Sequence, residues 1–201
     1  MGKRLFIFVE GGDDIRFFGR LIKPLLTARY ESVELIAYAC IKREKVNRFL
    51  RSLAKLGHDY IFVGDIDCEP SVEAKKFLLT GRYHELSGDH IVVVIREIES
   101  WYLAGLDDAT AKRLGVPHLE LTNTITKEDF NRMIPRGFAS KIDFMFEILK
   151  FFSLETAAVK NRSFRFFVRK YRILDGPDLS NEEEDRPTQA RGGPATTLPR
   201  T

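Results

Sequence analysis

The chain has 201 residues with ordinary apolar and charged fractions, which suit a single domain with a sizeable core. Its formal net charge of +3 excludes a polycation, so any nucleic-acid-binding surface must come from local clustering of Lys and Arg. Two cysteines, Cys40 and Cys68, exclude a disulfide framework and favour a reducing compartment.

The first predicted strand is the apolar run 5–9, which leads directly into Glu10-Gly11-Gly12-Asp13-Asp14. A helix is expected next, with Asp13 or Asp14 as a cap. Pro24 falls late in that helix and is expected to kink or end it. The inward face of this helix is formed by Phe17, Phe18, Leu21, Ile22 and Leu25.

The second strand is predicted over Val33 to Ala39 and is followed by an amphipathic helix that ends at Gly57. One side of the helix is apolar, and the other carries Lys42, Arg43, Lys45, Arg48, Arg51 and Lys55. The third strand, 61–63, runs through Gly64 into Asp65-Ile66-Asp67. A helix over 71–79 and a strand over 91–95 follow, and this last strand leads to Glu97 and Glu99.

Strands that alternate with helices predict parallel pairing through right-handed crossovers. We therefore expect an α/β fold over 1–105: a Rossmann-like, mostly parallel four-stranded sheet flanked by helices. A helical C-terminal part packed on it is expected over 106–174. Helices are predicted near 97–105, 107–114, 127–133, 138–152 and 162–172.

Residues 175–201 are rich in Gly, Pro, Thr and acidic side chains and are expected to be disordered. At the other end, a strand begins within a few residues of the N-terminus and leaves no room for a secretory signal. No segment approaches the roughly 18 apolar residues of a membrane span. We expect a soluble, cytoplasmic protein with no membrane partner.

Carboxylates follow three of the four predicted strands, at the point where each strand ends. If the strands are parallel, these acids share the edge of the sheet at which open α/β folds bind ligands. Two carboxylates about 4 Å apart repel by roughly 4 kcal/mol at an effective dielectric constant near 20. A proton or a divalent cation offsets such repulsion. The pattern therefore indicates a site of the magnesium type.

Each acid also has a purely structural interpretation. Asp13 is best explained as a helix cap, whereas Glu10 leaves an apolar strand and needs a partner. Asp65 and Asp67 alternate along an extended chain, so we expect both side chains to point the same way and to share a cation. Glu97 and Glu99 point the same way if the chain there is extended, and diverge if a helix has begun. Trp101 is expected in the core.

Two basic groups are candidates for phosphate contacts, although solvated helix faces explain such patterns equally well. Lys42 and Lys45 begin the helix after the second strand, at the same edge as the acids. Arg162 and Arg165 begin a stripe at helical spacing that continues through Arg169 and Arg172. The histidines show no metal-ligand spacing and neither cysteine has a CxxC partner, which argues against a zinc site.

The ordered set of motifs resembles the Toprim domain and, more narrowly, the small stand-alone Toprim-like proteins related to the OLD-family nucleases. Glu10 and Asp14 match the acids of Val-Glu-Gly-x-x-Asp, Asp65 and Asp67 match the Asp-x-Asp pair, and Glu99 begins Glu-Ser-Trp. The stretch 161–164, Asn-Arg-Ser-Phe, looks like the closing segment of the DUF4276-type members of that group. The resemblance covers about residues 4–172.

This resemblance implies a Mg²⁺-dependent centre, or one using Mn²⁺, for phosphoryl transfer on DNA or RNA. Its metal ligands would be drawn from Glu10, Asp14, Asp65, Asp67 and Glu99. Glu10, Asp65 and Asp67 would be the catalytic acids, Glu10 serving as general acid/base or as a ligand. Substrate would contact Gly11, Lys42, Lys45, Arg162 and Arg165. The chain lacks GxxxxGK[ST] and the additional modules of primases, so a nuclease is the best fit.

Three alternatives stay open. The same site would also suit a non-catalytic module that binds metal or nucleic acid in a defence or repair assembly. A phosphatase of the haloacid dehalogenase type has its Asp-x-Asp on the first strand, whereas here the motif follows the third. A receiver domain would use Asp13, Asp14 and Asp65 but would leave Glu97 and Glu99 unexplained.

Overall fold

Four strands form one parallel sheet, as the sequence predicted. The computed structural model describes residues 2–174. The strands are β1 (Arg4–Val9), β2 (Ser32–Ala37), β3 (Asp59–Asp65) and β4 (Ile91–Val94). Their order in the sheet is β2-β1-β3-β4, and every neighbouring pair is parallel. The strand order therefore reverses between β1 and β3, which is the position where open α/β sheets bind ligands.

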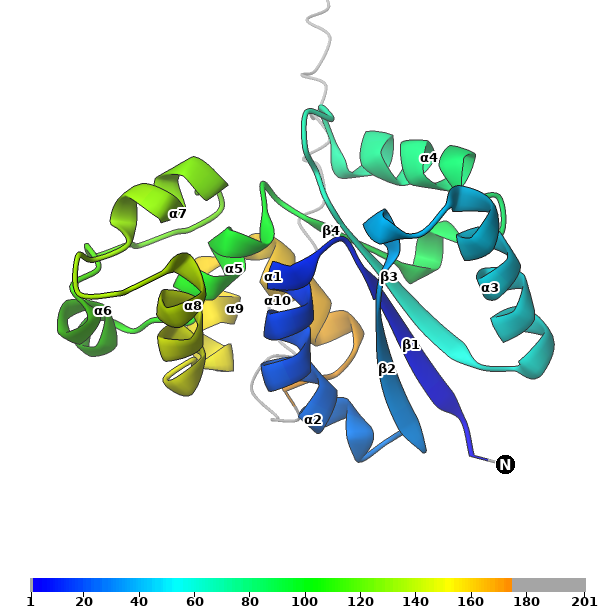
Figure 1. The fold of residues 1–201 in the computed structure, drawn as a ribbon, viewed down its shortest axis with the longest axis horizontal. Coiled ribbons are helices and arrows are strands. Elements are labelled where there is room, and N and C mark those ends of the chain that lie inside the picture. Colours follow the sequence, from blue (N-terminus) through cyan, green and yellow to red (C-terminus); the bar gives the residue numbers. More distant parts are fainter. Residues whose placement is uncertain (1, 175–201) are drawn as a thin grey trace, which may run out of the picture.

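Helices cover both faces of the sheet (Figure 1). On one face lie α3 (Arg43–Leu56) and α4 (Val72–Arg82), which pack through Val46, Leu50, Leu53 and Leu79. A π-helical segment, η1 (Phe18–Ile22), joins α1 (Gly12–Phe17) to α2 (Lys23–Thr27) on the opposite face. The helical run thus continues past Pro24, because the proline stands in the first turn of α2, where a missing N–H costs little.

The C-terminal half is helical and shares one core with the second face of the sheet. Its elements are α5 (Ile98–Ala104), α6 (Asp108–Leu114), α7 (Lys127–Met133), α8 (Lys141–Lys150), α9 (Leu154–Lys160) and α10 (Arg162–Lys170). Trp101 is fully buried there, between Phe164 and Phe167, which confirms its predicted place in the core. Within residues 2–174 no helix is long and apolar enough to cross a membrane.

Some boundaries differ from the prediction. The second strand ends at Ala37, because residues 38–40 turn into a short 3₁₀ helix, η2 (Tyr38–Cys40). Helix α8 begins after Ser140, whose hydroxyl accepts from the Asp143 N–H, and not at 138. Helix α9 was not predicted. The proposed C-terminal tail, 175–201, lies outside the described residues.

Candidate functional site

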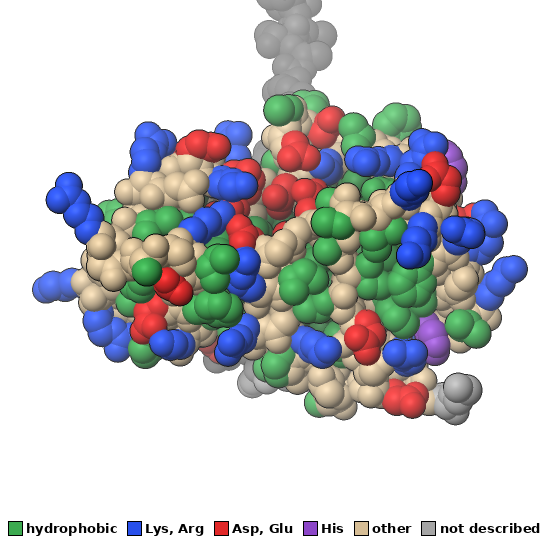
Figure 2. Space-filling model, viewed as in Figure 1, with side chains coloured by type: hydrophobic (Ala, Val, Ile, Leu, Met, Phe, Trp, Pro, Cys, Tyr) green, Lys and Arg blue, Asp and Glu red, His purple; other side chains and the backbone are tan. Residues whose placement is uncertain are grey.

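The acids predicted to meet do gather at the carboxyl edge of the sheet. Glu10 follows β1, Asp65 ends β3, and Glu99 lies in the first turn of α5, just beyond β4. Because β1 and β3 are neighbours, the first two acids lie directly beside each other. Figure 2 shows acidic side chains collected at the upper centre of the molecule, where Figure 1 places the strand ends.

Glu10 is held by two donors. Its Oε1 accepts from the hydroxyl of Tyr38 at 3.0 Å and from the backbone N–H of Asp65 at 3.2 Å. A Cβ at position 64 would lie 3.3 Å from that hydroxyl and 3.5 Å from Glu10 Oε1, so glycine there gives both groups room. Burial and the Glu10 carboxylate raise the pKa of Tyr38, which keeps the phenol protonated as a donor.

Asp14 is buried and lies on the inner side of the first turn of α1. Its Oδ2 accepts from the N–H of Gly11 at 3.0 Å, so it reaches back to the residue that begins the helix. Burial raises the pKa of Asp14 to about 7, and the charges of Glu10 and Glu99 add to this effect despite the Gly11 hydrogen bond. Asp14 is therefore both a helix-terminal acceptor and a member of the acid group.

Asp65 has the most unfavourable environment for a charge. Burial raises its pKa to about 9, with further increases from the carboxylates of Asp14, Glu10, Glu99 and Asp67. Its Oδ1 is buried and has no hydrogen-bond partner within residues 2–174. A buried polar atom without a partner is costly. The same five acids that the sequence analysis selected thus act on one another electrostatically, with Asp65 at their centre.

Asp67 does not follow the extended path that the sequence analysis expected, and that prediction was wrong. Its backbone is left-handed, with φ of 52°, so the chain turns just after Asp65. The Asp67 side chain instead pairs with Lys75 of α4. This ammonium is almost fully buried, whereas the carboxylate is 59% exposed. Asp67 therefore lies at the margin of the acid group, where a lysine neutralises it.

Glu99 is buried and is neutralised by Lys141, which begins α8. The Lys141 Nζ lies 2.6 Å from Glu99 Oε1 and 2.8 Å from Asp13 Oδ2. Burial alone would lower the pKa of Lys141, but the hydrogen bonds to both acids outweigh it and raise the pKa. Glu97 is the extended N-cap residue of α5 and accepts from the N–H of Lys127. Because the helix begins between Glu97 and Glu99, the two side chains diverge.

Asp13 lies outside the buried acid group. It pairs with Arg16 and Lys141, and these hydrogen bonds lower its pKa although burial alone would raise it. Gly11 precedes α1 with an extended backbone and does not itself cap the helix through a side chain. Its contribution is the N–H that Asp14 accepts.

The four basic residues predicted to bind phosphate do not lie together in the structure. Lys42 precedes the first residue of α3 and Lys45 lies in its first turn, and both are exposed near the acids' edge of the sheet. The guanidinium of Arg165 donates to the carbonyls of Ala158 and Val159 at the end of α9, which is a structural contact. Arg162 is exposed at the start of α10.

The 161–164 stretch has a structural role that the motif did not reveal. Asn161 is fully buried and its amide N–H groups donate to the hydroxyls of Ser100 and Thr122. Its Oδ1 accepts from Ser163, whose hydroxyl accepts from the Trp101 indole N–H and the Ile95 backbone N–H. This network fixes α5, and hence Glu99, against α10.

Three residues of the site were missed: Tyr38, Lys75 and Lys141. Lys75 did leave a signal, because it occupies the buried stripe of α4 between Val72 and Leu79, where an apolar residue is expected. A lysine in such a stripe indicates a buried acidic partner. Lys141 comes from a distant helix, and only the packing of α8 on α5 reveals its role.

The donor set suits a hard cation, since every ligand predicted is a carboxylate oxygen. Asp65 Oδ1 is a buried oxygen without a partner, as a cation-binding atom would be. Within residues 2–174, however, no three His, Cys, Asp or Glu side chains are arranged as a ready-made metal cage. Magnesium commonly uses only one or two protein carboxylates together with substrate phosphate oxygens and water. The residues therefore fit a metal shared with substrate.

No family model, curated protein or solved structure matches this chain.

Proposed function

We propose that this protein is a Mg²⁺-dependent phosphodiester hydrolase or phosphoryl-transfer protein of the Toprim type, acting on nucleic acid. The observation that carries the proposal is Asp65: a largely buried carboxyl with an unpartnered oxygen, surrounded by four other acids at the switch point of a parallel sheet. Such strongly raised pKa values concentrate at functional sites.

Each residue has a defined part in this proposal. Asp65 and Glu10 would hold the cation, with Asp14 and Glu99 contributing negative charge behind them. Magnesium bound there would polarise a phosphate and lower the pKa of an attacking water. Glu10, oriented by the Tyr38 hydroxyl and the Asp65 N–H, is placed to accept or return a proton. Lys141 keeps Glu99 in place and limits the net negative charge that the substrate's phosphates meet.

The test is cleavage of supercoiled plasmid DNA and of structured RNA, with Mg²⁺ or Mn²⁺. We expect cleavage by the wild type and loss of cleavage on Asp65→Asn or Glu10→Ala. Asp59→Asn is a matched control, because this acid lies at the opposite end of the same strand and pairs with Lys3. Cleavage that survives both active-site substitutions would overturn the catalytic proposal.

A metal-binding measurement provides a second readout that does not depend on turnover. Titration calorimetry with Mg²⁺ should detect binding to the wild type and to Asp59→Asn but not to Asp65→Asn. Since the metal is expected to share substrate oxygens, the affinity should rise when a non-cleavable oligonucleotide is present. Equal Mg²⁺ affinity for all three proteins would remove Asp65 from the metal site.

One observation favours a non-catalytic alternative. Asp67 and Glu99 are each neutralised by a lysine, so part of the acid group is satisfied without a metal. A module that binds metal or nucleic acid without cleaving it would have this property. Salt-dependent nucleic-acid binding with no cleavage under any metal condition would favour this second function over the first.

A further inference from the structure

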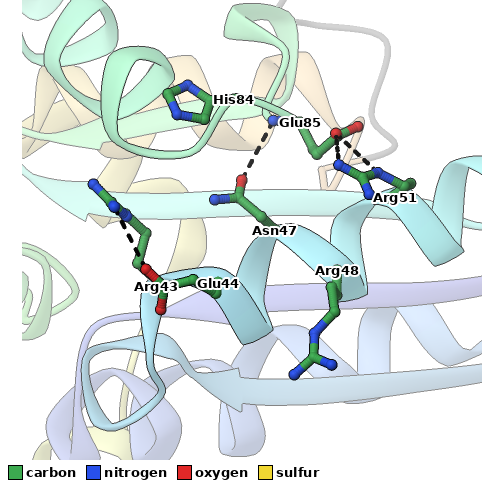
Figure 3. A pocket seen from close by; sticks show the side chains of 7 residues that line it. All are labelled: Arg43, Glu44, Asn47, Arg48, Arg51, His84 and Glu85. Atoms are coloured by element: carbon green, nitrogen blue, oxygen red, sulfur yellow. Dashed lines mark hydrogen bonds and ion pairs between the residues drawn. The ribbon is translucent and has the colours of Figure 1, made fainter.

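A cleft beside α3, outside the acid group, is lined by charged and polar residues. It has a volume of about 250 Å³ and lies between α3 and the segment that follows α4 (Figure 3). Its lining residues are Arg43, Glu44, Asn47, Arg48, Arg51, His84 and Glu85. We call it the arginine cleft.

Two contacts hold the wall of the arginine cleft together. Arg51 donates to Glu85 Oε1 from Nε at 3.0 Å and from Nη2 at 2.7 Å. The backbone N–H of Glu85 donates to Asn47 Oδ1 at 3.4 Å. Within residues 2–174, the Arg48 guanidinium and the Asn47 amide N–H groups have no hydrogen-bond partner. Arg43 in turn donates to Glu44 Oε1 at 3.4 Å, and the unpaired Arg48 guanidinium extends away from His84 and Glu85 (Figure 3). The cleft therefore has a built frame, with one unpaired guanidinium at its rim.

The net positive charge of Lys42 and α3 together exceeds the net charge of the whole chain. Lys42 and α3 together contain six basic residues and one acid, Glu44, whereas the entire chain has a net charge of only +3. Figure 2 shows the Lys and Arg side chains gathered over α3. The rest of the chain thus carries a slight net negative charge, and a dense group of positive charges lies along one helix.

The arginine cleft is adjacent to the acid group. Helix α3 begins at the carboxyl edge of the sheet, directly after η2, which contains Tyr38. The ring of Tyr38 packs against Tyr83, with centroids 5.9 Å apart, and its hydroxyl donates to Glu10. Both Glu10 and Arg43 lie close enough to Tyr83 to act on its phenol electrostatically. Tyr83 directly precedes His84 of the cleft wall, so the two tyrosines connect the acid group with the cleft.

We propose that the arginine cleft binds the phosphodiester backbone of a nucleic-acid strand whose scissile phosphate lies at the acid group. This inference rests on the proposed function and names the part of the substrate that lies away from the reaction. From Arg43 to Arg51, α3 spans about 12 Å, which corresponds to roughly three or four phosphates at the spacing of about 3.4 Å that one strand has along a duplex.

The chemistry of the lining favours this ligand. Guanidinium groups match phosphate oxygens in a planar, bidentate geometry. An acidic protein partner would need aromatic or aliphatic anchor side chains at the centre of its interface, whereas the apolar surface of this cleft comes only from the aliphatic parts of charged and polar residues. A single small anion would not use the row of exposed cations that continues along the helix.

The test measures oligonucleotide binding without turnover, in Asp65→Asn protein with EDTA, by fluorescence anisotropy. The probes are labelled single-stranded DNA and RNA of about a dozen nucleotides, enough to cover the acids and the helix. The triple variant Arg43→Gln/Arg48→Gln/Arg51→Gln is compared with Arg20→Gln/Arg113→Gln/Arg132→Gln. The control removes the same charge from exposed arginines outside the cleft.

We expect the cleft variant to bind at least tenfold more weakly at low salt, and the control to bind like the parent. The slope of log K against log salt should decrease by about 2 in magnitude for the cleft variant, from about 0.7 for each lost phosphate contact. Arg48→Gln alone should remove about one contact, and it breaks no ion pair in the described residues. Equal losses in both triple variants, or unchanged slopes, would overturn the inference.

Two further outcomes separate this inference from the proposed function. If the protein cleaves nucleic acid but the cleft variant keeps a normal KM for long substrates, the cleft inference fails while the nuclease proposal stands. If the protein cleaves no nucleic acid but the cleft variant loses oligonucleotide binding, the nuclease proposal fails while the cleft inference stands. Two competition results would also overturn the cleft inference. One is that poly-glutamate displaces the probe as well as an unlabelled oligonucleotide of equal charge does. The other is that inorganic phosphate displaces the probe more than chloride does at equal ionic strength.

Discussion

Asp65→Asn should make the metal-free protein more stable, although it removes a central residue of the proposed site. The pKa of this carboxyl rises from 3.8 in the unfolded chain to about 9 in the folded protein. Folding near neutral pH therefore requires Asp65 to take up a proton. Asparagine is nearly the same shape and needs no proton, so the substitution removes that cost.

The expected gain follows from linkage between protonation and folding. Each pKa unit corresponds to about 1.4 kcal/mol, and about three units separate the unfolded value from pH 7, which gives at most about 4 kcal/mol. Rearrangement of the neighbouring acids reduces this figure, and we expect about 2–4 kcal/mol, or roughly 5–12 °C in Tm.

The pH dependence provides the sharpest check. Below the unfolded pKa, Asp65 is protonated in both states and the two proteins should be equally stable. As the pH rises towards 9, the folded wild type still binds a proton that the unfolded chain has lost, so its stability falls. The advantage of Asp65→Asn should therefore be small near about pH 4 and large near about pH 8.

Urea unfolding in EDTA at both pH values measures this advantage directly. Asp59→Asn is the control, because its carboxylate is partly exposed and pairs with Lys3 at 2.9 Å. That variant should gain nothing at either pH. If Asp65→Asn is no more stable than the wild type near pH 8, or if its advantage does not grow with pH, the argument that Asp65 is desolvated among other acids is refuted.

Three other substitutions test the surroundings of the site. Lys141→Gln should destabilise the protein by about 3 kcal/mol in urea unfolding because it leaves Glu99 buried without its cation, and an unchanged stability would contradict this role. Asn161→Ala should cost about 2–3 kcal/mol in the same assay, since it leaves several buried donors and acceptors unpaired, and a cost below about 1 kcal/mol would contradict the network. Gly105→Ala should lower Tm through an overpacking cost of about 1–3 kcal/mol, because its Cβ would clash with the ring of Phe152. Gly81→Ala should not lower Tm, since nothing lies within 4 Å of a Cβ at that position.

The sheet could be predicted because its signals are local. Apolar runs that end in Gly or acidic residues mark parallel strands, and the alternation with helices fixes their direction. The meeting of Glu10 and Asp65 needed more, since it depends on β1 and β3 being neighbours. The periodicity of the sequence does not predict the order of the strands in the sheet. That order depends on which face of the sheet each connecting helix covers.

The parts that could not be predicted depend on contacts between distant segments. Asp67 adopts a left-handed backbone, which is unfavourable for a residue with a Cβ, and its ion pair with Lys75 accompanies that conformation. An Asp-x-Asp pattern taken alone gives no reason to expect such a turn. Lys141 reaches Glu99 only because α8 packs against α5, and nothing near either residue in the sequence indicates it.

The partners of each acid explain why Asp65 is the centre of the site. Glu10 accepts from a phenol and a backbone N–H, Asp14 accepts from Gly11, and Asp67 and Glu99 each have a lysine. Of these five acids, only Asp65 retains a buried oxygen with no donor among the described residues. A proton or a cation can satisfy that oxygen, and the two compete for it. Metal binding should therefore strengthen as the pH rises towards the pKa of Asp65, in the same range in which the metal-free protein loses stability.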